Sequence, residues 1–87
     1  MSRPAVTIYV SDWCPYCGRA KDLLTRKNVV FNEINVEDDA KSREEMIARS
    51  NRRTVPQIFI GDAHVGGCDD LFELDRSGKL DQLLQGA

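Results

Sequence analysis

The chain has 87 residues, of which 41% are apolar and 30% are charged, and its formal net charge is −2. These values are typical of one compact soluble domain, and we expect residues 1–87 to form a single domain. So small a net charge excludes strong attraction to nucleic acid or to anionic membranes, and no apolar run is long enough to span a bilayer. The start of the chain shows no signal-peptide pattern and the cysteines are odd in number, so we expect a reducing compartment, the cytoplasm.

The N-terminal part of the chain predicts a buried strand followed by a helix. Residues 5–10 form a short run rich in β-branched side chains, which is typical of a buried strand. Pro15 suits the first turn of a helix, and Asn28 suits the left-handed conformation that often ends one. Helical spacing predicts one buried face, which consists of Cys17, Ala20, Leu23 and Leu24.

A second strand and a second helix follow. Residues 29–36 alternate apolar and polar side chains toward their end, so we expect a strand with one wetter face. Asp38 or Asp39 can cap a helix that runs to about Ser50, with Met46 facing the core.

The C-terminal part predicts two strands joined by a tight turn, and then two helices. Residues 54–60 predict a third strand, and a turn at 61–62 leads into a short fourth strand at 63–65. A third helix begins near Cys68, and Ser77 can cap the last helix.

The resulting order is β-α-β-α-β-β-α-α, an α/β arrangement. A strand–helix–strand opening implies a right-handed parallel crossover, and the tight turn implies an antiparallel pair. We therefore expect a mixed four-stranded sheet with helices on both faces.

Cys14 and Cys17 form a Cys-x-x-Cys motif at the start of a helix that follows a strand. The thiolate is the nucleophile of thiol–disulfide exchange, and the unpaired N–H groups of a helix N-terminus favour it. Cys14, the expected N-cap residue, faces those groups, whereas Cys17 lies one turn further in on the buried face. We therefore expect the Cys14 thiolate to attack a disulfide and Cys17 to resolve the mixed disulfide.

Two other interpretations of the cysteines remain open, namely half-buried structural thiols and metal ligands. The chain offers one possible Cys₃His zinc set, which consists of Cys14, Cys17, His64 and Cys68. The second pair lacks the spacing of a zinc knuckle, and Pro15 suits a helix start better than a metal turn. We expect no metal, a packing role for Cys68 and an ordinary strand position for His64.

The dipeptide Val55-Pro56 opens the predicted third strand. Proline has no N–H, so it cannot pair normally within a central strand. A cis peptide bond would explain its place and would leave the N–H and C=O of Val55 free to pair with an extended peptide substrate. The alternative is an edge-strand proline without a role, and the neighbouring redox motif favours the substrate interpretation.

The segment Gly66-Gly67-Cys68-Asp69-Asp70 has the features of a second ligand contact. Two glycines allow a ligand to approach the backbone closely, and the helix that begins near Cys68 presents N–H groups to a carboxylate. Asp69 can accept from an ammonium group, so a free amino-acid end would satisfy both. The alternative is a glycine turn followed by acids that complement the helix dipole.

Three segments together resemble the glutaredoxin family, in its small dithiol class. They are Cys-Pro-Tyr-Cys at 14–17, TVPQIFI at 54–60 and GGCDD at 66–70. The resemblance covers essentially the whole chain and implies the thioredoxin fold, with glutathione as co-substrate. It implies the reduction of protein disulfides and of protein–glutathione mixed disulfides. We expect a monomer that binds glutathione and disulfide-containing or glutathionylated proteins, and neither nucleic acid nor membrane.

The resemblance also implies a glutathione site. Its residues are Tyr16, Arg43, Thr54, Val55, Pro56, Gly67, Cys68 and Asp69. The backbone of Val55 would pair with the cysteinyl part of glutathione, and Thr54 would support that loop. Residues 67–69 would hold the γ-glutamyl end, Tyr16 would border the groove, and Arg43 would reach the glycine carboxylate.

One position departs from the family pattern. Many glutaredoxins carry a lysine three residues before the first active-site cysteine, where this chain has Ser11, and Trp13 adds an aromatic wall beside the thiol. Cationic help for the Cys14 thiolate must then come from the helix terminus or from Arg19, Lys21, Arg43 or Arg52. We expect altered affinity or rate rather than lost activity.

Two alternatives concern the electron source and the class of function. Some small redoxins are reduced by a thioredoxin reductase, against which the acidic, glycine-rich segment 66–70 argues. Some glutaredoxins hold a [2Fe–2S] cluster between two protomers through the first cysteine, here Cys14, and glutathione. Pro15 disfavours that cluster, whereas Trp13 resembles some members that bind it.

Overall fold

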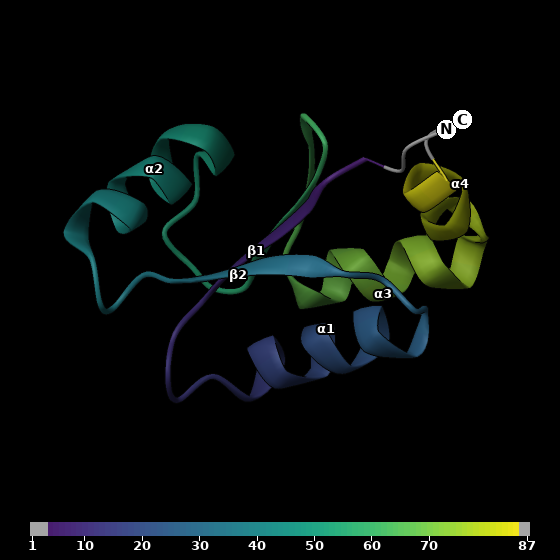
Figure 1. Ribbon diagram of the computed structural model, residues 1–87, viewed down its shortest axis with the longest axis horizontal. Helices are drawn as coiled ribbons and strands as arrows, with labels where there is room; N and C mark the ends of the chain where they lie inside the picture. The colour runs from purple at the N-terminus through teal and green to yellow at the C-terminus, as the bar shows by residue number, and fades with distance from the viewer. Residues whose placement is uncertain (1–3, 86–87) are drawn as a thin grey trace.

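The computed structural model describes residues 4–85 of the chain (Figure 1). In chain order the elements are β1 (Val6–Val10), α1 (Pro15–Arg26), β2 (Phe31–Asn35), α2 (Ala40–Ser50), β3 (Gln57–Ile60), β4 (Ala63–Gly66), α3 (Cys68–Ser77) and α4 (Lys79–Gln85). This is the predicted order of strands and helices. Among the described residues, no helix is long and apolar enough to cross a membrane.

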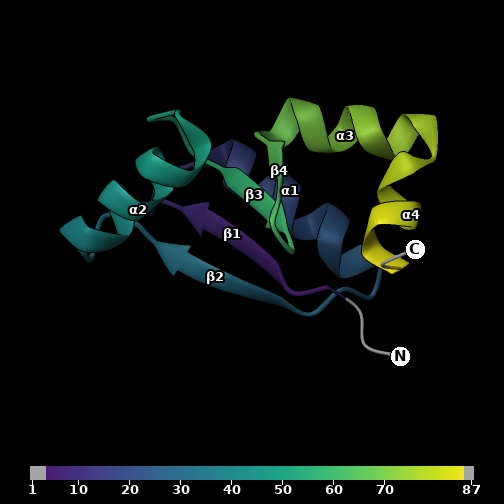
Figure 2. The same cartoon turned by 90° about the horizontal axis from the view of Figure 1, so that it is seen from above.

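The strands form one mixed sheet in the order β2-β1-β3-β4. β1 and β2 run parallel because α1 carries the chain back between them, whereas β1 with β3 and β3 with β4 are antiparallel. α2 covers one face of the sheet, and α1 and α3 lie together on the other (Figures 1 and 2). The predicted mixed sheet with helices on both faces is confirmed.

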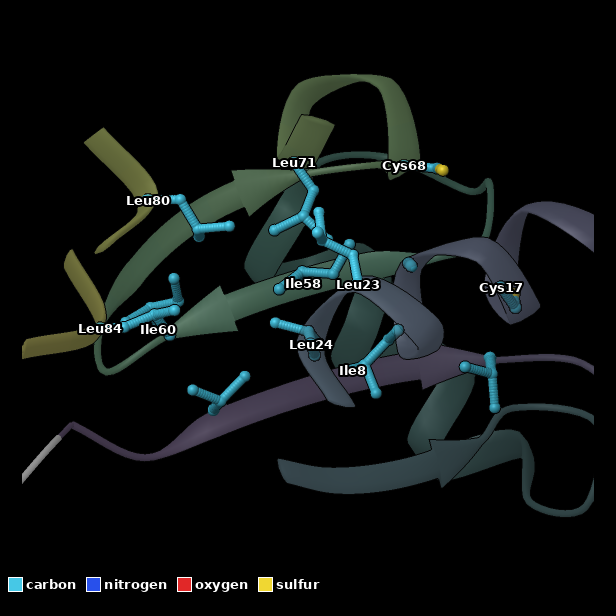
Figure 3. Packing of buried hydrophobic residues seen from close by; sticks show 13 residues of the cluster. Ile8, Cys17, Leu23, Leu24, Ile58, Ile60, Cys68, Leu71, Leu80 and Leu84 are labelled. Atoms are coloured by element: carbon cyan, nitrogen blue, oxygen red, sulfur yellow. The ribbon is translucent and has the colours of Figure 1, made fainter. Parts of the chain in front are cut away.

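The larger core cluster fills the space between the sheet and helices α1, α3 and α4 (Figure 3). Ile8 of β1 and Ile58 of β3 are fully buried there, and they pack with Leu24 of α1 and Leu71 of α3. The predicted buried face of α1 is confirmed, since its buried residues are Cys17, Ala20, Leu23 and Leu24. This burial removes apolar side chains from water and so holds α1, α3 and α4 to the sheet.

A smaller core cluster lies between α2 and the opposite face of the sheet. Its buried residues are Tyr9, Val36, Met46 and Phe59. Tyr9 and Phe59 reach this face because neighbouring side chains of a strand alternate, and their rings meet edge to face at 5.8 Å. The Tyr9 hydroxyl donates to Glu45 at 2.8 Å and accepts from Arg49 at 3.0 Å, so its polar end is satisfied at the surface of α2.

The end of α1 explains why the second strand starts later than predicted. Asn28 has the predicted left-handed backbone, with φ of 60°. The N–H of Val29 bonds back to the carbonyl oxygen of Leu24 at 3.0 Å, so Val29 still belongs to the helix end. The strand therefore begins at Phe31, and Val30 remains exposed to solvent.

Two other predicted boundaries are wrong for local reasons. The third strand begins at Gln57 rather than at residue 54, because Pro56 has no N–H to contribute to a ladder. Ser77 ends α3 instead of capping α4, because Gly78 adopts a left-handed φ of 81° and breaks the chain direction there.

Candidate active site

Cys14 is the N-cap residue of α1, as its spacing predicts. Its backbone is extended, with φ of −124° and ψ of 99°, and Pro15 follows in the first helical turn. The Sγ atom of Cys14 accepts the backbone N–H of Cys17 at 3.1 Å, and its thiol faces the carbonyl oxygen of Val55 at 3.8 Å. A half-buried sulfur therefore lies where the helix presents its unpaired N–H groups.

Cys17 differs from Cys14 in its surroundings. It lies on the buried face of α1 and is only 2% exposed. Burial, together with the hydrogen bond to Cys14, raises the pKa of Cys17 to about 12. Cys17 is therefore a neutral thiol near neutral pH.

The peptide bond between Val55 and Pro56 is cis, which was one of the two interpretations of this dipeptide. Pro56 directly precedes β3, a central strand of the sheet, so it is not an edge-strand proline. The side chain of Gln57 donates to the carbonyl and hydroxyl oxygens of Thr54 at 3.0 and 3.2 Å, and so closes the loop 54–56 onto the strand.

The side chain of Asp70, the third residue of α3, caps the N-terminus of this helix. Gly67 is the N-cap, and its N–H donates to the carboxylate of Asp70 at 2.9 Å. Gly66 has a φ of 118°, and a Cβ atom at this position would overlap that carboxylate, lying 2.8 Å from Cγ of Asp70. A glycine is therefore required before the helix for Asp70 to reach the cap.

Arg52 is linked to this same carboxylate. Its guanidinium donates to Asp70 at 3.0 Å, so the segment after α2 is tied to the start of α3. The hydrogen bond from Gly67 and the Arg52 guanidinium lower the pKa of Asp70 below its ordinary value. The carboxylate is thus charged near neutral pH, and its Oδ2 atom accepts from both Gly67 and Arg52.

A surface groove of about 220 Å³ runs between the cis-proline loop and the N-terminus of α3. The residues that line it are Tyr16, Arg52, Thr54, Val55, Pro56, Gly67, Cys68, Asp69 and Asp70. Seven of the eight residues predicted to contact glutathione are in this set. Arg43 is exposed on α2 and does not line the groove, whereas Arg52 does.

The residues of the zinc interpretation are not gathered in the described part of the chain. No group of three or more His, Cys, Asp or Glu side chains among residues 4–85 could hold a metal ion. His64 instead pairs with the side chain of Gln57 at 2.7 Å. Cys68 is buried at the start of α3, where burial and the nearby Asp69 carboxylate raise its pKa.

The cations near the site have defined partners. Arg52 pairs with Asp70, and the Lys21 ammonium lies 3.0 Å from Glu33. The Arg19 guanidinium lies over the ring of Tyr16, 5.6 Å from its centre. Arg19 therefore lies beside the groove, over the ring that borders it, and the cationic group in the groove wall itself is Arg52.

The predicted glutathione set did not include Arg52 and Asp70, although Arg52 was named as a possible source of cationic help and Asp70 lies in the segment 66–70 that was predicted to contact a ligand. Asp70 has a readable signal, because an acid three residues after an N-cap forms a capping box. The signal was obscured because Gly67 offers no side chain of its own to mark it as the cap. Arg52 lies in a basic segment without a pattern, so only the folded chain brings it to Asp70.

Known proteins share both the sequence and the fold. The family model described as Glutaredoxin matches residues 6–65. The chain is 58% identical over 80 residues to glutaredoxin 3 of Escherichia coli, and the aligned residues make up 92% of this chain and 96% of that protein. The solution structure of glutaredoxin from Brucella melitensis has 55% identity and a TM-score of 0.86, covering 98% of this chain and 92% of that one.

A further solved relative is the buckwheat glutaredoxin–glutathione complex, with 30% identity and a TM-score of 0.84 over 94% of this chain and 76% of that one. These structures confirm the thioredoxin fold that the resemblance implied. With a family model over more than half of the chain and relatives of such identity, the chain belongs to the glutaredoxin family.

Proposed function

We propose that this chain is a glutathione-dependent thiol–disulfide oxidoreductase that reduces protein disulfides and protein–glutathione mixed disulfides. The observation that supports this most is the place of the Cys14 sulfur. It lies at the N-terminus of α1 and 3.8 Å from the carbonyl oxygen of Val55, which lines the groove. A ligand in the groove can therefore present a sulfur atom to Cys14. Glutathione is the ligand named for the buckwheat relative.

The chemistry follows from the difference between the two thiols. The Cys14 thiolate attacks the glutathione sulfur of a mixed disulfide, the old S–S bond breaks, and the protein thiolate leaves and takes up a proton. A second glutathione thiolate then attacks the Cys14–glutathione bond, which releases glutathione disulfide and reduced Cys14. With a protein disulfide, the Cys14 thiolate first forms a mixed disulfide with one substrate sulfur. Cys17 then loses its proton and attacks Cys14, the bond from Cys14 to the substrate breaks, and the substrate leaves as a dithiol. This leaves a Cys14–Cys17 disulfide, which two glutathione thiols reduce in turn with release of glutathione disulfide.

The groove supports a specific arrangement of glutathione. We assign the backbone of Val55 to the cysteinyl part, because extended peptides pair with free N–H and C=O groups of a loop that a cis proline exposes. The N-terminus of α3 would receive the γ-glutamyl carboxylate, and Asp69 its ammonium group. Arg52 in the groove wall would attract the glycine carboxylate, while the predicted contact of Arg43 with that group stays a prediction.

We further propose that residues 1–87 act as a monomeric single domain in the cytoplasm. The two core clusters leave only Trp13, Tyr16 and Val30 as exposed large apolar side chains among residues 4–85, which supports a monomer. Sedimentation velocity tests the monomer, and cell fractionation tests the compartment.

Substitution of the two active-site cysteines tests the function. Cys17→Ser should retain the removal of glutathione from a glutathionylated peptide, because that route needs only Cys14, but it should lose the reduction of a protein disulfide. Cys14→Ser should lower both activities by roughly a thousandfold or more, because a hydroxyl cannot replace the thiolate. An assay that measures glutathione disulfide formed per turnover gives both rates.

The two variants check each other. Both keep a residue of similar size at each position, so circular dichroism should give the same folded spectrum for each. Appreciable activity of Cys14→Ser toward the glutathionylated peptide would contradict the proposed function.

A further inference from the structure

A chain of hydrogen bonds runs from β4 to the loop that lines the groove. His64 of β4 lies 2.7 Å from Oε1 of Gln57, at the start of β3. The amide nitrogen of Gln57 donates to the carbonyl oxygen of Thr54 at 3.0 Å and to its hydroxyl at 3.2 Å. The three side chains therefore form one continuous connection, which ends one residue before Val55.

The middle member of this series of hydrogen bonds, the Gln57 side chain, is completely enclosed. Gln57 has no exposed surface, and it is one of two buried polar residues in the described part of the molecule. A buried amide needs partners for both its oxygen and its nitrogen, because a missing partner leaves a desolvated polar group. Thr54 satisfies the nitrogen and His64 satisfies the oxygen.

The direction of the hydrogen bonds follows from the chemistry of the groups. The carbonyl oxygen of Thr54 can only accept, so the NH₂ group of Gln57 must face it and the amide oxygen must face His64. His64 therefore carries a proton on Nε2 and donates it. This donation takes place in both the neutral and the protonated ring, so the connection persists across the charge change of the imidazole.

The imidazole is held in place by a second contact. His64 pairs with Phe59 across the strands, and the two rings lie 5.0 Å apart with a tilt of 32°. Phe59 is itself anchored in the core cluster under α2. The contact with Phe59 therefore holds the His64 ring in position to hydrogen-bond Gln57, although His64 itself is exposed to solvent.

We propose that His64 is a positioning residue for glutathione binding, which acts through Gln57 on the loop that carries Thr54 and Val55. This inference rests on the proposed function, because the loop matters to activity only if glutathione pairs with it. Without the donor on His64, the buried oxygen of Gln57 has no partner, and the free-energy cost of that unpaired group favours a rearrangement of the amide that loosens its hydrogen bonds to Thr54. The backbone of Val55 is then less well aligned for a peptide-like ligand.

Two substitutions at the same position separate positioning from packing. His64→Phe keeps an aromatic ring against Phe59 but removes the donor, whereas His64→Gln keeps a donor and removes the ring. His64→Phe should lower the second-order rate constant for Cys14 with a glutathionylated peptide by roughly fivefold, the factor expected for one hydrogen bond. His64→Gln should stay within about twofold of the original chain, since its amide can supply the same donor.

Alkylation of Cys14 by iodoacetamide supplies the control, because this reagent has no glutathione moiety to bind in the groove. Its rate should be equal in all three proteins. The backbone amide signals of Thr54 and Val55 in ¹⁵N–¹H spectra should move in His64→Phe and not in His64→Gln, whether or not glutathione is the substrate.

The outcomes are distinct. If His64→Phe reacts like the original chain and its loop signals do not move, the positioning role is wrong. If His64→Gln is as slow as His64→Phe, the ring matters by packing and the proposal is also wrong. If the original chain itself does not prefer a glutathionylated over a cysteinylated peptide, the proposed function fails, while the spectra still decide whether His64 holds the loop.

Discussion

Cys14 combines two tasks that most helices give to different residues. A helix usually starts with Ser, Thr, Asp or Asn, whose oxygen accepts an N–H of the first turn. Here the acceptor is the reacting sulfur, which takes the N–H of Cys17 at 3.1 Å. The hydrogen bond that starts α1 is therefore accepted by the same sulfur that reacts.

Asp70 is the residue whose charge should couple stability to pH. Its folded pKa lies below the ordinary value of 3.8, so its stabilising effect is present above about pH 4 and is lost as the pH falls through the folded pKa. Asp70→Asn should lower the free energy of unfolding by about 0.5–1 kcal/mol at pH 7, because the half-exposed carboxylate is screened by solvent. At a pH low enough to protonate the carboxyl in the folded protein, the difference between the two proteins should vanish.

Urea unfolding at both pH values measures this difference. Asp62→Asn is the matched control, since Asp62 is an exposed turn residue that makes no side-chain hydrogen bond within residues 4–85. An equal loss for Asp70→Asn at pH 7 and at low pH would show that shape, not charge, is what Asp70 contributes.

The helices and strands could be predicted where a local pattern decides them. The buried face of α1 follows from the spacing of its apolar residues, and the left-handed Asn28 follows from side-chain chemistry. One boundary that was wrong, the start of β2, depends on a hydrogen bond that a pattern does not reveal. Val29 is apolar and β-branched, yet its N–H is committed to Leu24 of the preceding helix.

The sequence motifs of the candidate site could be predicted, whereas the side-chain contacts between its segments could not. The cysteine pair, the cis proline and the glycine turn each have a physical signature in the sequence. The contacts of Arg52 with Asp70 and of Gln57 with His64 join residues 18 and 7 positions apart, and folding alone brings them together. Such contacts need the register of β3 and β4 and the path of the chain after α2.

The junction of β4 and α3 should depend on glycine at one position. Gly66→Ala should lower the free energy of unfolding by about 1–3 kcal/mol, because its φ of 118° is unfavourable for alanine and the new methyl group would displace the Asp70 carboxylate. Urea unfolding followed by circular dichroism measures the change.

Gly18 in α1 provides the opposite case. A Cβ atom there would meet no atom within 4 Å, so Gly18→Ala should stabilise the protein by about 0.4–1 kcal/mol through helix propensity. If both alanine variants changed stability equally, conformation and crowding at Gly66 would not be the cause.

The two core clusters divide the burial between the faces of the sheet. The larger cluster joins α1, α3 and α4 to the sheet, and Leu71 of α3 is fully buried within it (Figure 3). Leu71→Ala should lower the free energy of unfolding by about 2–5 kcal/mol and the Tm by more than about 10 °C, because the cavity left behind cannot collapse fully. A thermal melt followed by far-ultraviolet circular dichroism tests this.

Val30 is the control for this truncation, because its side chain is 94% exposed. Val30→Ala removes apolar atoms without opening a cavity and should change stability by less than about 0.5 kcal/mol. A small effect at Leu71 would mean that α3 is not held by the larger cluster.

Trp13 gives the molecule an optical property that follows from its position. It is the only tryptophan in the sequence, it is 94% exposed, and it directly precedes Cys14. Because the indole is already surrounded by water in the folded protein, we expect unfolding of the core to shift its emission wavelength little. We expect the charge and bonding of the neighbouring sulfur, by contrast, to change its quenching. Fluorescence of this one side chain should therefore report the redox state of the site and respond little to unfolding.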